Sequence, residues 1–284
     1  MAFPETVLAQ HDGVRIAALD WGGRGTPLLM LHPNGLCAGL YDPIARALAA
    51  EGGFRPVGVD IRGHGASDKP MPPDPYSYEV MAGDVAAVLD LLGLDEVVAV
   101  GGSLGGGVAI HLDRLQPGRL RRMLLCEAIA APAAERLGEK NPMVAAALRR
   151  RVVWPSRDDM VASYAARPPL GELAPEALRA YVEWGTTVRE DGTLALACPP
   201  AVEAAIFGSP VTVPGVARAW DHLPHLSAPA MILAGTDSAL SRPMVEAQAA
   251  HAGVPFGLVS GGHFFLHEDT RRGAELIRTH LGAT

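Results

Sequence analysis

The stretch Val100-Gly101-Gly102-Ser103-Leu104-Gly105-Gly106-Gly107 decides how this chain folds. It begins at the end of a short apolar run from Glu96 to Val100 and continues into apolar residues at helical spacing from Leu104 to Gln116. A serine between glycines at such a junction matches the G-x-S-x-G pattern, whose tight turn raises the serine hydroxyl above a sheet. Glycine suits positions 101 and 105 because a side chain there would collide with its neighbours. The stretch therefore predicts a parallel sheet with Ser103 as a candidate nucleophile.

Strand and helix patterns alternate on both sides of this turn. A hairpin is expected around His11-Asp12-Gly13, and short apolar runs predict strands that are buried on both faces. Longer amphipathic patterns predict the helices between them. This alternation is typical of an α/β fold with a mostly parallel sheet, here of eight strands, flanked by helices. The expected strands are 5–10, 15–20, 27–31, 56–60, 96–100, 120–126, 229–234 and 256–260, and the expected helices are 41–50, 78–92, 104–116, 243–251 and 269–281.

The alternation stops between Pro132 and Leu226, where prolines separate helical segments such as 143–151 and 175–184. A break of about 95 residues is longer than an ordinary connection in a compact domain, so it is expected to be structured and functional. We therefore expect an α/β core domain formed by residues 1–131 and 227–284, with a helical cap or lid over residues 132–226.

Composition excludes several classes of protein. Hydrophobic residues make up 49% of the chain and the formal net charge is −7, so there is no basic field of the kind that holds nucleic acid. No run approaches the ~18 apolar residues that a membrane span needs. Cys37, Cys126 and Cys198 are odd in number and lack zinc-ligand spacing, and His222 and His225 lack a third ligand. We expect a cytoplasmic protein without metal or cofactor and without nucleic-acid or membrane partners; the sequence leaves a homodimer open.

A serine hydroxyl is a weak nucleophile unless a base takes its proton. Gly261-Gly262-His263-Phe264-Phe265 follows the last expected strand, so His263 is the candidate base. Two carboxylates could orient it, Glu127 after strand 120–126 and Asp237 after strand 229–234. Both lie at the carboxyl edge of the sheet, where a site assembles. The spacing alone leaves the choice between them open.

Taken in order, these motifs resemble a capped α/β-hydrolase, and the similarity covers essentially all of the chain outside the expected cap. In that family the commonest acid stands three residues after the glycine that ends its strand, where this chain has Ser238, so Asp237 lies one residue early. The stretch Cys126 to Pro132, which contains Glu127, is similar to the segment that carries the acid in some haloalkane dehalogenases. Certain lactone hydrolases have a glutamate there. The resemblance thus favours Glu127, with Asp237 as the alternative.

The resemblance also identifies an oxyanion site. His32-Pro33-Asn34-Gly35 stands where the family usually has His-Gly. Because Pro33 has no N–H, the resemblance implies the backbone N–H of Asn34 as one donor and that of Leu104 as the second. The stretch from Arg62 to Asp68, which includes His64, resembles another family signature and is interpreted as a structural turn.

The nucleophile sets the expected reaction. Related dehalogenases and epoxide hydrolases have an aspartate at this turn, whereas this chain has Ser103, which favours acyl transfer followed by hydrolysis. We expect a carboxylic ester or lactone hydrolase. The alternatives are a thioester or C–C bond hydrolase, a cofactor-free perhydrolase that uses the same residues, and a non-catalytic protein that binds a small molecule on the same fold.

Aromatic residues suggest where a substrate would bind. Trp154 and Trp184 fall in the expected cap, and Phe264 follows the candidate base. Aromatic side chains beside a catalytic edge are typical of an apolar acyl or alcohol pocket. An aromatic core of the cap itself would explain the two tryptophans equally well.

Overall fold

The computed structural model describes residues 4–72, 76–132, 140–208 and 216–282. Its main sheet has eight strands in the order β1-β2-β4-β3-β5-β6-β10-β11. Strand β2 pairs antiparallel with both of its neighbours, β1 and β4, and all the other pairs are parallel. This confirms the predicted mostly parallel sheet. The strands are β1 Glu5–His11, β2 Val14–Asp20, β3 Thr26–Leu31, β4 Phe54–Val59, β5 Val97–Gly102, β6 Leu120–Cys126, β10 Ala230–Gly235 and β11 Phe256–Val259.

Helices cover both faces of the sheet, and strand alternation sends side chains to two separate cores. In β3, Leu29 and Leu31 join the core beneath one set of helices, while Leu28 and Met30 join the core on the opposite face. The first face carries α2 Tyr78–Leu91, α3 Leu104–Leu115 and α9 Arg242–Ala252; the second carries α1 Asp42–Ala50 and α11 Thr270–Leu281.

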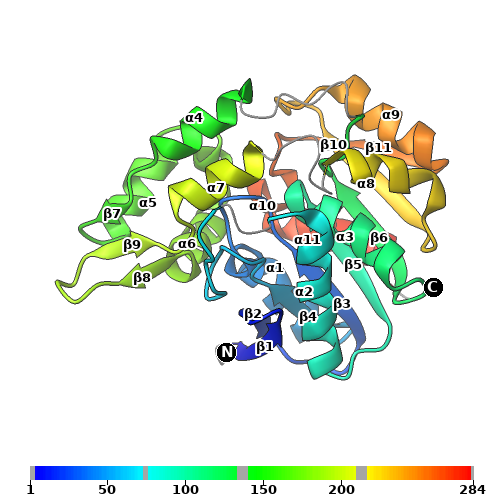
Figure 1. Ribbon diagram of the computed structural model, residues 1–284, viewed down its shortest axis with the longest axis horizontal. Helices are drawn as coiled ribbons and strands as arrows, with labels where there is room; N and C mark the ends of the chain where they lie inside the picture. The colour runs from blue at the N-terminus through cyan, green and yellow to red at the C-terminus, as the bar shows by residue number, and fades with distance from the viewer. Residues whose placement is uncertain (1–3, 73–75, 133–139, 209–215, 283–284) are drawn as a thin grey trace.

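The segment between β6 and β10 has a third hydrophobic cluster, which it shares with Leu36, Cys37 and Leu40 from the stretch after β3. It also contains a small antiparallel sheet that the sequence did not predict, because its strands are only two or three residues long. Figure 1 shows most of the segment to one side of the main sheet. Its elements are α4 Pro142–Leu148, β7 Val153–Trp154, α5 Arg157–Ala165, α6 Pro175–Trp184, β8 Thr186–Val188, β9 Leu194–Leu196, α7 Pro200–Phe207 and α8 Val216–His222.

Helix α8 is placed differently from the rest of this segment. It packs against α3, and its Ala219 belongs to the core beneath α2 and α3, as does Leu223 directly after the helix. In Figure 1 it lies beside α9, away from α4 to α7. The expected cap, residues 132–226, therefore includes one helix that packs against the core domain.

Cys37, Cys126 and Cys198 are all buried free thiols, as small apolar side chains would be. Among the described helices, none combines the length and the apolar character that would let it cross a bilayer.

Candidate active site

Ser103 occupies a strained turn between β5 and α3. Its backbone has φ 52° and ψ −117°, in a region that non-glycine residues rarely adopt, and the residue is 8% exposed. The turn is tight, since a Cβ on Gly101 would lie 2.6 Å from the Gly105 carbonyl oxygen. A Cβ on Gly105 would lie 2.2 Å from the Leu31 carbonyl oxygen. The structure therefore requires glycine at both positions that the sequence singled out.

Leu104 is the first residue of α3. The first N–H groups of a helix have no acceptor within the helix, and the helix dipole places partial positive charge there. The Ser103 N–H itself donates to the Cys126 carbonyl at 3.0 Å, so the turn lies beside the end of β6. An anion that forms at Ser103 would thus meet the positive end of α3.

Glu127 follows β6 and is 1% exposed, with φ 49°. Its Oε1 accepts the Gly235 N–H at 2.9 Å, and its Oε2 accepts the Ser238 hydroxyl at 2.7 Å. Oε2 also lies 2.5 Å from His263 Nδ1. A buried carboxylate is costly without donors, and these three groups supply them.

His263 follows β11 and its side chain is 22% exposed. Because Glu127 is an acceptor, Nδ1 is assigned as the protonated nitrogen, which leaves Nε2 free to accept a proton. Its ring lies 5.0 Å from that of Phe264, measured between centroids. The structure thus places an oriented imidazole, with an apolar neighbour, at the edge that carries Ser103.

Asp237, the alternative acid, is exposed, and its hydrogen bonds within the described residues are with Thr236 and Gly261 rather than with His263. Its N–H donates to the Gly261 carbonyl at 2.9 Å, and its carboxylate accepts the Thr236 hydroxyl at 3.0 Å. The neighbouring Ser238, at the position where the resemblance places the acid, contributes its hydroxyl to Glu127 instead. The geometry favours Glu127.

Histidines hold the loop after β3. Gly35 N–H donates to Nε2 of the buried His64 at 3.0 Å, and Ile61 N–H donates to Nε2 of the buried His32 at 3.0 Å. Burial lowers the pKa of His32 to about 4 and lowers that of His64 well below its ordinary value. Both rings stay neutral acceptors near pH 7, which agrees with the structural turn expected around His64. Asn34 is half-buried beside them, and its side-chain amide donates to the Glu203 carbonyl at 3.1 Å.

Trp154 is a packing residue in the structure. It is buried in the core of the inserted segment, with its ring edge-on to Tyr164, and its Nε1 donates to the Arg151 carbonyl at 3.2 Å. The alternative explanation, an aromatic core of the cap, therefore accounts for Trp154 better than a substrate contact does.

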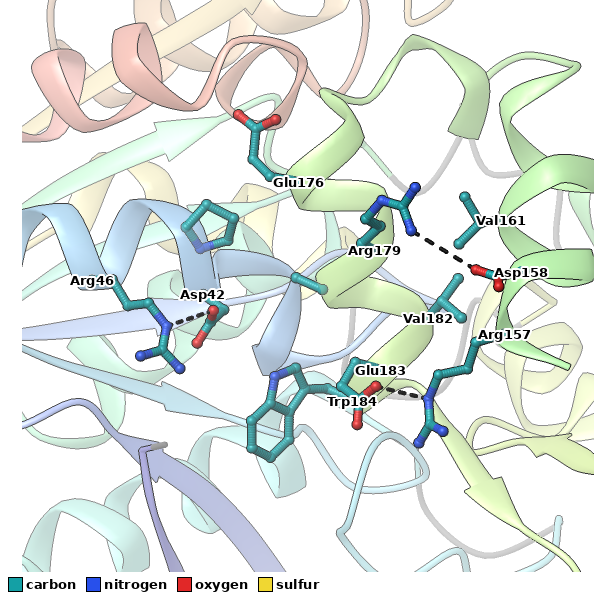
Figure 2. A pocket seen from close by; sticks show the side chains of 12 residues that line it. Asp42, Arg46, Arg157, Asp158, Val161, Glu176, Arg179, Val182, Glu183 and Trp184 are labelled. Carbon is teal, nitrogen blue, oxygen red and sulfur yellow. Dashed lines mark hydrogen bonds and ion pairs between the residues drawn. The ribbon is translucent and has the colours of Figure 1, made fainter. Parts of the chain in front are cut away.

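Trp184 borders a surface pocket of about 530 Å³ between α1 and the helices α5 and α6 (Figure 2). None of Ser103, Glu127 and His263 lines this pocket, and most of its charged side chains pair with each other. Trp184 thus lines a pocket that does not include Ser103, and its assignment to substrate binding stays a prediction. The pairs are Arg46 with Asp42, Arg157 with Glu183 and Arg179 with Asp158.

Two supporting contacts were not predicted from the sequence: the hydrogen bond of Ser238 to Glu127 and the hydrogen bonds of Gln248 to the loop after Glu127. Ser238 could have been found from its place after β10, but nothing local marks Gln248. From α9, the buried Gln248 amide donates to the carbonyls of Ala128 and Ala130 at 2.9 Å each, and so fixes the loop that follows Glu127. Within the described part of the chain, no group of three or more His, Cys, Asp or Glu side chains is arranged to hold a metal ion.

Comparison with curated proteins gives several relatives. The chain is 34% identical over 148 residues to an AB hydrolase superfamily protein of Bacillus subtilis, covering 52% of this chain and 51% of that protein. It is 37% identical over 133 residues to a bifunctional esterase/perhydrolase of Acinetobacter calcoaceticus, covering 46% of each. It is also 37% identical over 120 residues to a non-heme chloroperoxidase of Streptomyces lividans, covering 42% of each. The matches thus span about half the length of these relatives.

Solved structures match over nearly the full length. An E-2-(acetamidomethylene)succinate hydrolase superposes with a TM-score of 0.80 at 20% identity, covering 98% of this chain and 99% of that one. An N-acyl homoserine lactone degrading enzyme superposes with a TM-score of 0.69 at 25% identity, covering 97% and 100%. The family model for the alpha/beta hydrolase fold matches residues 26–199. The chain therefore belongs to the alpha/beta hydrolase fold family.

Proposed function

We propose that this chain is a serine hydrolase that cleaves a carboxylic ester or a lactone through an acyl-enzyme. The observation that carries the proposal is the 2.5 Å hydrogen bond between the buried Glu127 carboxylate and His263, at the sheet edge where Ser103 occupies its strained turn. Nucleophile, base and acid then have the roles of a Ser-His-acid triad.

The first half of the reaction transfers the acyl group. His263 Nε2 takes the Ser103 proton while Oγ attacks the substrate carbonyl carbon, and the backbone N–H groups of Asn34 and Leu104 donate to the resulting oxyanion. Glu127 stabilises the imidazolium that forms. When the tetrahedral intermediate collapses, the C–O bond to the alcohol breaks and His263 returns the proton to that alcohol.

The second half releases the acid. His263 removes a proton from water, the hydroxide attacks the acyl carbon, and Ser103 leaves with the proton returned by His263. An ester yields an acid and an alcohol, whereas a lactone yields one ring-opened hydroxy acid. The half-buried Phe264 is proposed to contact the apolar part of the substrate, with the segment between β6 and β10 acting as the cap.

The comparisons support this class and suggest a second activity. One relative is named an esterase, and one matched structure is described as degrading N-acyl homoserine lactones. The same relative is also named a perhydrolase, and others are named chloroperoxidases. In perhydrolysis hydrogen peroxide replaces water in the second half-reaction, so that a peracid forms without a cofactor.

The test is turnover of p-nitrophenyl esters of increasing chain length and of a small lactone panel, with and without hydrogen peroxide. Ser103→Ala is expected to lower kcat by roughly 10³-fold or more, because the nucleophile is removed. Ser163→Ala, in the inserted segment, is the matched control and should keep wild-type turnover. Wild-type rates in folded Ser103→Ala, or no turnover of any substrate by the folded wild type, would contradict the proposal.

A further inference from the structure

The loop that carries Asn34 and Gly35 is held by side chains from the inserted segment. Arg150 Nη1 donates to the Gly35 carbonyl at 3.2 Å, and the Tyr181 hydroxyl donates to the same oxygen at 3.2 Å. Arg150 Nη2 in turn donates to the Tyr181 hydroxyl at 2.6 Å. One carbonyl of the candidate oxyanion loop is thus fixed by two residues that lie far along the chain, after α4 and in α6.

This network has a buried charge at its centre. The Arg150 side chain is 16% exposed and the Glu203 side chain 9%, and Arg150 Nη1 lies 2.5 Å from Glu203 Oε2. A charge pair removed from water needs good geometry and further hydrogen bonds. The hydroxyls of Tyr164 and Tyr181 supply two of these by accepting from Arg150 Nη2. The Glu203 backbone carbonyl also accepts a hydrogen bond from the Asn34 side-chain amide. Arg150 therefore bonds to Gly35, and the backbone of its partner Glu203 bonds to Asn34.

Close packing leaves the loop little room to move. Gly35 has φ +75°, and a Cβ placed on it would lie 2.6 Å from Glu203 Oε1 and 3.0 Å from Arg150 Nη1. On its other side, Gly35 N–H donates to His64 Nε2. The loop is clamped between a histidine of the core and an ion pair of the inserted segment.

We infer that Arg150, together with Glu203 and Tyr181, positions the oxyanion donor at Asn34, so that the inserted segment contributes to transition-state stabilisation as well as covering the site. This inference rests on the proposed hydrolase function. An oxyanion donor is effective only when its N–H points at the atom where negative charge develops. A positioning residue of this kind affects kcat, because the oxyanion forms only after the substrate has bound.

Two tyrosines give a matched test. Both hydroxyls accept a hydrogen bond from Arg150 Nη2, at 2.6 Å for Tyr181 and 3.2 Å for Tyr164, but among the described contacts only Tyr181 also bonds to Gly35. Tyr181→Phe is expected to lower kcat by roughly 3–10-fold with KM little changed, since the loop loses the hydrogen bond from the Tyr181 hydroxyl to the Gly35 carbonyl. Tyr164→Phe removes the same atom elsewhere in the network and should stay within about twofold of the wild type.

Arg150→Lys gives the larger effect. Lysine keeps the charge but lacks the planar fork that reaches several acceptors at once. We expect kcat to fall by roughly 10–100-fold, approaching the loss of an oxyanion donor. The affinity for phenylboronic acid, whose tetrahedral serine adduct places an oxygen at the oxyanion donors, should fall by a similar factor. Arg189→Lys, at an exposed position of the same segment, is the control and should leave both unchanged.

The outcomes separate the two proposals. If folded Tyr181→Phe and Arg150→Lys keep wild-type kcat and boronate affinity, the positioning role is overturned, even where their thermal stability falls. If Ser103→Ala keeps wild-type turnover, the proposed function fails instead. A loss of kcat in Tyr181→Phe and Arg150→Lys, together with an inactive Ser103→Ala and an unaffected Tyr164→Phe, supports both.

Discussion

Strands β6 and β10 are neighbours that end at the same edge of the sheet, yet the residues after them differ. The register pairs Cys126 with Leu233, so the two ends lie side by side. After β6, the buried Glu127 carboxylate contacts a backbone N–H, a hydroxyl and an imidazole. After β10, the exposed Asp237 carboxylate accepts a hydrogen bond from the adjacent Thr236.

The number of hydrogen-bond donors around each carboxylate distinguishes Glu127 from Asp237 better than their positions after the two strands do. The end of β10 contributes the donors Gly235 N–H and Ser238 hydroxyl, and the end of β6 contributes the acceptor. A buried carboxylate with such partners is held in one orientation, whereas an exposed one is free to turn toward water. The account therefore assigns the acid role to Glu127, and the following predictions test that assignment.

The largest expected effect is that of removing the acid after β6. Glu127→Ala should lower kcat on a p-nitrophenyl ester by roughly 10³–10⁴-fold, because His263 loses both its orientation and the charge that stabilises the imidazolium. Circular dichroism checks that the variant is folded. A loss of less than tenfold would show that another group orients His263.

A second variant should recover part of this loss. The Ser238 hydroxyl lies 2.7 Å from Glu127 Oε2, so a carboxylate at position 238 would come close to His263. We expect Glu127→Ala/Ser238→Asp to regain roughly tenfold in kcat over Glu127→Ala. Glu127→Ala/Ala239→Asp adds the same charge at an exposed position and is expected to give no recovery. Equal rates in the two double variants would contradict the shared position.

The variants should be compared above pH 6.5, because acid destabilises the fold itself. Burial lowers the pKa of His32 to about 4 and that of His267 to about 3, from 6.5. Below pH 6.5 the unfolded chain binds protons that the folded chain does not, so stability is full above that pH and falls as pH drops toward 4. Urea unfolding should show a slope of about 1.4 kcal/mol per pH unit for each such histidine.

A substitution tests the origin of this pH dependence. His267→Phe is expected to reduce the slope by the contribution of one group, whereas His251→Gln, at an exposed position, should leave it unchanged. An unaltered slope in His267→Phe would show that other groups cause the acid destabilisation.

The smallest expected effect is that of the acid after β10. Asp237→Asn should keep kcat and KM within about twofold of the wild type, as surface substitutions away from a site commonly do. Steady-state kinetics on the same ester measures this. A loss of two orders of magnitude would reverse the comparison between the two strand ends.

The features that the sequence predicted are those set by neighbouring residues. The turn at Ser103 follows from glycines two residues to either side and from the apolar runs that flank them, all within one short stretch. The hairpin of β1 and β2 and the strand β6 likewise follow from local patterns. Such features depend on backbone sterics and periodicity, which a single stretch of sequence carries.

The features that the sequence did not decide depend on residues far apart. Whether Glu127 or Asp237 reaches His263 depends on the register between β6 and β10, which no local pattern encodes. The contacts of Arg150 with the loop after β3 join positions 115 residues apart. The strands β7 to β9 are too short for their alternation to be recognised.

The most direct test of the central claim needs no knowledge of the substrate. It is the rate at which diethyl p-nitrophenyl phosphate labels Ser103, followed by intact mass in the wild type, Glu127→Gln and Asp237→Asn, with Ser103→Ala as the unlabelled control. The account predicts labelling slowed by roughly 10²-fold or more in Glu127→Gln and unchanged in Asp237→Asn, because only Glu127 orients the base that activates the serine. Wild-type labelling in Glu127→Gln together with slowed labelling in Asp237→Asn would contradict it.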